Sequence, residues 1–171
     1  FPLSDARTYY EWSARIAAGD WWKGDVFYQS PLYAYFLALI RALGGHSLVV
    51  IHIVQVVLGA LSCVLLAVAG TALLGPAGGA LAGLLLAIDA PAIYFDGLLQ
   101  KTMLDIVLLS ALVARLVTMQ YRPRTRAWLA SGVLLALLGL SRENALALAG
   151  VIPAWAWFGF RDVPARQRWA W

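Results

Sequence analysis

A single carboxylate near the start of the chain stands among aromatic and apolar residues. Residues 4–18 are typical of an amphipathic helix that Ser4 caps and Gly19 ends. At about 100° per residue, one stripe of this helix carries Asp5, Tyr9, Trp12 and Ile16. Because burying a charge is costly, Asp5 is a candidate general base that would activate an acceptor hydroxyl or amine. The alternative is a first-turn carboxylate that only stabilises the helix dipole.

A second cluster of ionisable residues lies in the stretch DAPAIYFDGLLQKTMLD, beside two apolar segments. It contains Asp89, Asp96, Lys101 and Asp105. An ionisable group at the bilayer centre costs roughly 2.5–3.5 kcal/mol, so several together indicate a water-filled or ligand-filled cavity. We favour function for Lys101 and Asp105, although an i,i+4 salt bridge between them is the structural alternative. Asp96 is interpreted as a solvated loop residue.

A third cluster, Arg142-Glu143-Asn144, interrupts an apolar stretch late in the chain. The guanidinium of Arg142 could hold a phosphate in bidentate fashion. An Arg142–Glu143 ion pair that simply turns the chain is the alternative interpretation. The two possibilities are left open at this point.

The remaining residues match no other catalytic pattern. The chain has no metal-ligand spacing, no Ser-His-Asp arrangement, no P-loop and no dinucleotide fingerprint. Its one cysteine, Cys63, excludes an internal disulfide. His52 and Gln55 are about one turn apart and are predicted to form hydrogen bonds between helices. We therefore predict no cofactor and no metal site; the outer acids could hold a divalent ion, but nothing defines a coordination set.

The composition places these residues in a membrane protein. Of 171 residues, 62% are hydrophobic and 13% are charged, and the mean hydropathy is +0.75. These values predict an all-α polytopic membrane helical bundle rather than a soluble domain. The sequence starts at Phe1 within a pattern and stops after a basic segment, so we expect it to be an excerpt of a longer protein.

The apolar segments define the elements that must position the candidate residues. Residues 1–46 are predicted to form an outer loop with two interfacial helices, at 4–18 and 31–43. Residues 47–171 are predicted to form a five-span transmembrane bundle. Its spans are 47–72, 77–95 and 102–119, followed by a hairpin over 127–160 that SREN (141–144) interrupts. The fourfold spacing of Gly75, Gly79 and Gly83 predicts close helix packing.

Arginines predict the orientation of the bundle. They cluster at Arg122, Arg124 and Arg126, and again at Arg161, Arg166 and Arg168. In a five-span bundle both groups lie on one side, which the positive-inside rule makes cytoplasmic. Most acids, Asp5 and Asp105 among them, then gather at the outer ends. We expect a multi-pass protein of the bacterial inner (plasma) membrane with a periplasmic or extracellular active site, and no nucleic-acid partner.

Four segments in this order resemble a known family. They are DARTYYEWSARIAAGDW (5–21), FYQSPLYAYF (27–36), MLD (103–105) and LLGLSRENALAL (137–148). The chain looks like the N-terminal part of polytopic GT-C glycosyltransferases of the protein-O-mannosyltransferase type (glycosyltransferase family 39). It departs from the members that transfer aminoarabinose to lipid A at Ser30 and Arg142, where those members have lysine. Serine in place of lysine at position 30 leaves the identity of the substrate open. Arginine in place of lysine at position 142 keeps the positive charge but changes its hydrogen-bonding geometry.

The resemblance implies an inverting glycosyltransferase. A polyprenyl-phosphate sugar would present its reacting carbon at the outer surface, and a hydroxyl or amine of a lipid, glycan or protein acceptor would attack it. Asp5 would be the catalytic base. The substrate-binding residues would be Tyr9, Lys101, Asp105, Arg142 and Glu143. Lys101 and Arg142 would stabilise the leaving phosphate, and Asp105 would orient Lys101 or contact the sugar.

Two other functions fit the residues alone. A transporter or flippase would use an outward-facing polar cavity, but it predicts inverted repeats and broken helices at the membrane midplane. The sequence shows no internal symmetry. A non-catalytic membrane subunit would use the same polar residues for packing and orientation, and it predicts that Asp5, Lys101 and Arg142 tolerate neutral substitution together.

Overall fold

The computed structural model describes residues 5–22, 29–45, 47–120 and 125–159, and their regular elements are all helical. Seven α-helices are named here in chain order: α1 (Asp5–Ala17), α2 (Pro31–Gly44), α3 (Leu48–Ala87), α4 (Ala90–Asp96), α5 (Thr102–Met119), α6 (Thr125–Ser141) and α7 (Leu148–Gly159). A 3-10 turn, Glu143–Ala147, joins the last two. The predicted all-α class is confirmed.

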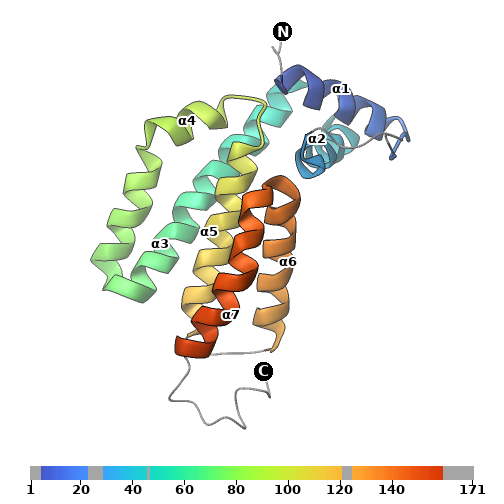
Figure 1. Cartoon of the computed structure of the whole chain (residues 1–171). Coiled ribbons are helices and arrows are strands. Elements are labelled where there is room, and N and C mark those ends of the chain that lie inside the picture. The colour runs from blue at the N-terminus through green and yellow to red at the C-terminus, as the bar shows by residue number, and fades with distance from the viewer. Residues whose placement is uncertain (1–4, 23–28, 46, 121–124, 160–171) are drawn as a thin grey trace.

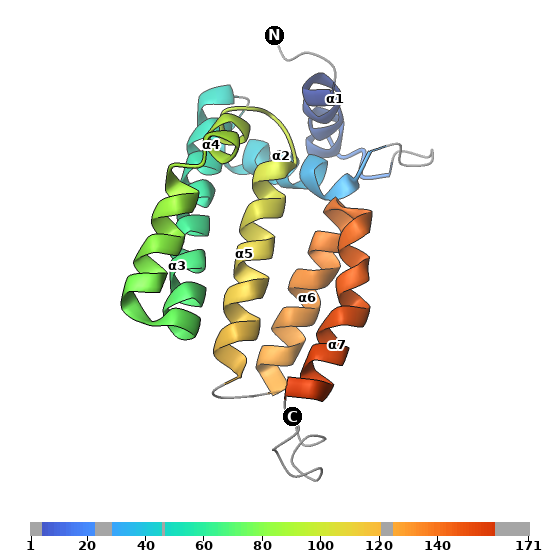
Figure 2. The ribbon, with the colours of Figure 1, turned by 60° about the vertical axis from the view of Figure 1, so that its left-hand side comes forward.

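The helices form a bundle with two further helices across one end. In Figures 1 and 2, α3, α5, α6 and α7 run alongside one another, whereas α1 and α2 lie across the end where α3 and α5 begin. The turn between α6 and α7 reaches the same end. Segments far apart in sequence, including the start of the chain and residues 141–144, therefore meet there.

The amphipathic pattern of α1 explains how it attaches to α2. Tyr9, Trp12 and Ile16 are buried, as the helical spacing predicts, and the ring of Tyr9 meets that of Tyr33 edge-on at 5.0 Å. Asp5 shares their stripe but is exposed, because it lies at the end of the helix rather than between the buried rings. The opposite face carries an ion pair at i,i+4 spacing, with Nε of Arg7 2.7 Å from Oε1 of Glu11.

Small residues let α3 fold back on itself as two packed arms. Gly75 has a φ of 81°, a left-handed conformation that suits glycine, and Pro76 follows it. A Cβ added to Gly79 would lie 1.9 Å from the hydroxyl oxygen of Thr71, and one on Gly83 would meet the backbone of Cys63 at 2.9 Å. The predicted packing role is confirmed for Gly79 and Gly83, whereas Gly75 makes the turn.

The predicted second span, 77–95, is wrong in its extent. The helix ends at Ala87, and a separate short helix, α4, begins at Ala90. The cause is the sequence Asp-Ala-Pro: the Asp89 carboxylate accepts a hydrogen bond from the amide of Ala92 at 2.9 Å and caps α4. Pro91 lies in the first turn of α4, where its missing N–H costs no hydrogen bond.

The segment between α4 and α5 is tied to α3 by the two side chains expected to bridge helices. His52 Nε2 lies 3.2 Å from the carbonyl oxygen of Gly97, and Gln55 Nε2 donates to that of Leu98 at 2.7 Å. Asp96 is not a freely solvated loop residue, because its carboxylate packs against Gly59 of α3. Burial raises the pKa of Asp96 above its usual value.

Within the described residues, α3 and α5 are long and apolar enough to cross a membrane, and α6 is a shorter apolar helix. Large apolar side chains cover the outside of α3, among them Val57, Leu74 and Leu84. The five-span division of residues 47–171 and the 1–46 outer loop stay predictions. Several sequence expectations concern residues outside the described ranges: the Ser4 cap and the arginines at 122, 124, 161, 166 and 168.

Candidate active site

A cavity of about 730 Å³ opens at the end of the bundle where α1 and α2 lie. Its wall is built from α1, the segment before α2, the residue before α5 and the end of α6 with the following turn. The lining residues are Asp5, Tyr9, Gln29, Ser30, Pro31, Lys101, Gly139, Leu140, Arg142, Glu143 and Asn144. Five of the six residues predicted for the site line this cavity. The sixth, Asp105, forms an ion pair with the lining residue Arg142.

The ammonium of Lys101 is held in the cavity wall by two acceptors. Its Nζ donates to the hydroxyl oxygen of Ser30 at 2.8 Å and to the carbonyl oxygen of Ser141 at 2.9 Å. Ser30 precedes α2 at the N-cap position, yet its side chain does not cap that helix. Since an ammonium has three N–H donors, one remains for a ligand.

Asp105 pairs with Arg142, not with Lys101. One of its oxygens accepts from Nε of Arg142 at 2.6 Å, and the other accepts a short hydrogen bond from the hydroxyl of Ser141. Asp105 is buried, whereas the Arg142 side chain is half-exposed. The carboxylate thus holds the guanidinium through Nε, and no described residue accepts a hydrogen bond from its two amino groups. Neither the Lys101–Asp105 pair nor the Arg142–Glu143 pair forms.

Asp5 and Tyr9 face the cavity from α1. Among the described residues, no hydrogen bond or ion pair occupies the Asp5 carboxylate, so its oxygens are available to accept a proton. Burial, then the charges of Asp5 and Asp105, raise the pKa of Tyr9 from 10.0 to about 12. The phenol therefore stays neutral at physiological pH and can donate a hydrogen bond.

Sequence reasoning missed Gln29 and Ser141, and it noted Ser30 only as a departure from a relative. All three are neutral polar residues, and the partners of the two serines lie far away in sequence: Ser30 and Lys101 are 71 positions apart, and Ser141 and Asp105 are 36 apart. The only local signal was that both serines sit at a helix end. Glu143 and Asn144 line the cavity and are exposed.

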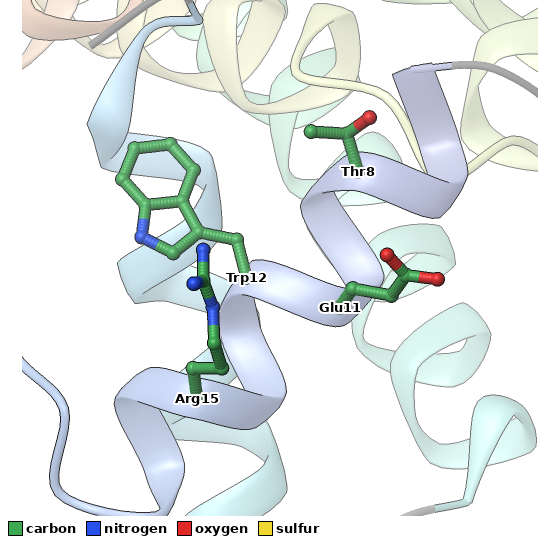
Figure 3. A pocket seen from close by; sticks show the side chains of 4 residues that line it. All are labelled: Thr8, Glu11, Trp12 and Arg15. Carbon is green, nitrogen blue, oxygen red and sulfur yellow. The ribbon is translucent and has the colours of Figure 1, made fainter. Parts of the chain in front are cut away.

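A second, smaller cavity of about 370 Å³ lies along the flank of α1, lined by Thr8, Glu11, Trp12 and Arg15. In Figure 3 the Arg15 side chain extends toward Trp12, while the Glu11 carboxylate points to the other side. None of the residues predicted for the site lines it. No three His, Cys, Asp or Glu side chains in the described ranges come close enough together to hold a metal ion.

Comparison with known proteins identifies one family. The family described as dolichyl-phosphate-mannose-protein mannosyltransferase matches residues 28–171. The matched part includes Ser30, Lys101, Asp105 and Arg142, whereas Asp5 and Tyr9 precede it. No curated protein and no solved structure matches the chain.

Proposed function

Because the chain belongs to the dolichyl-phosphate-mannose-protein mannosyltransferase family and is therefore a membrane glycosyltransferase, we propose that its larger cavity transfers mannose from a polyprenyl-phosphate donor. The acceptor is a hydroxyl or amine presented at the outer face of the membrane. The observation that carries this proposal is that the Asp5 carboxylate, which has no partner among the described residues, and the cations Lys101 and Arg142 come from three distant parts of the chain and line a single cavity.

The reaction is one displacement at the anomeric carbon. The acceptor oxygen or nitrogen forms a bond to that carbon from the side of Asp5, and the carboxylate takes the acceptor's proton. The bond from the carbon to the phosphate oxygen breaks, and its electron pair leaves with the polyprenyl phosphate. Attack opposite the leaving group inverts the anomeric configuration.

The leaving group needs cations rather than an acid, because a phosphate is stable as an anion. In this proposal the third donor of Lys101 and the two amino groups of Arg142 stabilise the charge that develops on the leaving phosphate. Asp105 holds Arg142 in position through one oxygen and accepts from the Ser141 hydroxyl with the other, so we assign it a positioning role. Tyr9 donates a hydrogen bond into the cavity, and Glu143 lies at its exposed rim.

The test uses the full-length protein with a synthetic polyprenyl-phosphate mannose. Wild-type enzyme should form a mannosylated product whose anomeric configuration is opposite to that of the donor. Lys101→Met should raise the KM for the donor about tenfold or more, since a charge-assisted hydrogen bond to phosphate is lost. Arg115→Met, an exposed cation further along α5, is the matched control. A Lys101→Met enzyme with the donor KM of the control would refute the proposed cation site.

A further inference from the structure

Three neutral side chains in the described ranges keep a buried polar atom that has no hydrogen-bond partner: Oε1 of Gln29, Oη of Tyr33 and Oε1 of Gln55. Such atoms are rare in folded proteins, because an unsatisfied buried group costs about 1–3 kcal/mol. Of the three residues, only Gln29 lines the larger cavity. A polar group without a hydrogen-bond partner on a residue that lines a cavity is a candidate to form a hydrogen bond with a ligand.

Within the part of the chain that the structure describes, the amide of Gln29 makes no hydrogen bond. No described residue accepts from its nitrogen or donates to its oxygen. Gln55 differs, because its nitrogen donates to the carbonyl of Leu98 and thereby ties α3 to the segment before α5. Gln55 therefore has a structural role, whereas the Gln29 amide offers both a donor and an acceptor that no described residue engages.

The neighbours of Gln29 indicate which part of a ligand would reach it. The next residue, Ser30, accepts a hydrogen bond from the ammonium of Lys101, and both Gln29 and Ser30 line the larger cavity. The Asp5 carboxylate faces the same cavity from α1. A sugar whose phosphate is bound by Lys101 and whose anomeric carbon is reached from Asp5 would therefore occupy the cavity that Gln29 lines.

We propose that Gln29 recognises one hydroxyl of the donor sugar and so sets sugar specificity. A hydroxyl both donates and accepts, which matches the two ends of an amide. Rotation of the amide toward the cavity on donor binding gives its oxygen the partner that it lacks. A site whose amide binds a sugar hydroxyl discriminates against a sugar that lacks this hydroxyl, because the amide then has no hydrogen-bond partner. This inference rests on the proposed mannosyl-phosphate donor.

The test compares full-length wild-type enzyme and Gln29→Met, which keeps the length of the side chain but removes the amide. The probes are polyprenyl-phosphate mannose and its 2-, 3-, 4- and 6-deoxy analogues. We expect Gln29→Met to lower kcat/KM for mannose about tenfold, the cost of one hydrogen bond. For one deoxy analogue, kcat/KM of the wild type should be about tenfold lower than for mannose. In Gln29→Met, the same analogue should have a kcat/KM no lower than that for mannose.

Gln55→Met is the matched control, since it removes a buried amide from a residue that does not line the cavity. It should lower thermal stability without changing the ranking of the five donors. Equal losses for all donors in Gln29→Met would overturn the specificity role and leave the transferase intact. No transfer by the wild type from any of the donors would overturn the proposed donor, and the role of Gln29 with it.

Discussion

Asp105 shows how a single buried acid determines what an exposed cation can do. One oxygen accepts from the Ser141 hydroxyl and the other from Nε of Arg142, so the guanidinium is held at Nε while its two amino groups have no partner among the described residues. A lysine at position 142 would keep the charge but could not be held by one nitrogen while offering two others. The arrangement therefore suits an arginine, and it makes Asp105 a positioning residue.

This pairing predicts that Asp105 and Arg142 act as a unit. Asp105→Asn should raise the KM for the donor about tenfold or more, because a charged hydrogen bond is lost. Arg142→Lys should have a similar effect, and the double variant should be little worse than either single one. Steady-state kinetics of the four enzymes measure this coupling, with Thr118→Ala, at the far end of α5, as the control. Fully additive losses would show that the two side chains act independently.

At the level of elements, the site depends on helix ends that meet rather than on any one helix. Ser30 stands at the N-cap position of α2, but its hydroxyl oxygen accepts a hydrogen bond from Lys101. Ser141 is the last residue of α6, and its carbonyl oxygen accepts from the same ammonium. Helix ends carry backbone and side-chain groups that the helix itself does not use. Their convergence supplies the acceptors that hold the cation.

The folded-back α3 brings α4 and the segment before α5 into place, so its tight packing should contribute to stability. Gly79→Ala places a methyl group against Thr71 and the backbone of Ala67, and it should lower the free energy of unfolding by about 1–3 kcal/mol. Gly132→Ala on α6 meets nothing within 4 Å and should be neutral or slightly stabilising. Thermal unfolding of both variants in detergent tests this; an unchanged Gly79→Ala protein would contradict the packing argument.

At the scale of the whole molecule, the polar residues gather at one end of an apolar bundle. Periodicity predicted the helices and the buried face of α1, because both follow from local spacing: Tyr9, Trp12 and Ile16 are apolar at helical intervals. The break at Asp89 was missed because hydrophobicity continued through it, although the capping acid and the proline were visible in the sequence. The partners of Lys101 and Asp105 could not be predicted, since they come from elements 36 to 71 residues away.

The same limit applies to Gln29. A neutral amide has no charge whose burial would indicate a function from sequence. Only the three-dimensional structure shows that its oxygen is buried without a hydrogen-bond partner. Asp5, by contrast, was identifiable because an acid within an apolar stripe conflicts with its surroundings. Charged residues in unusual places are therefore predictable from sequence, whereas the neutral residues that complete a cavity depend on tertiary structure.

The central claim is that Asp5 is the base of a mannosyl transfer carried out in the larger cavity. The most direct measurement is single-turnover transfer from polyprenyl-phosphate mannose by full-length Asp5→Asn, with donor binding measured in parallel. Glu11→Gln, an exposed acid on the same helix, is the matched control. We predict that Asp5→Asn binds the donor like the wild type but loses transfer by at least about a hundredfold, the usual range for a general base. Near-normal transfer by Asp5→Asn would contradict the account.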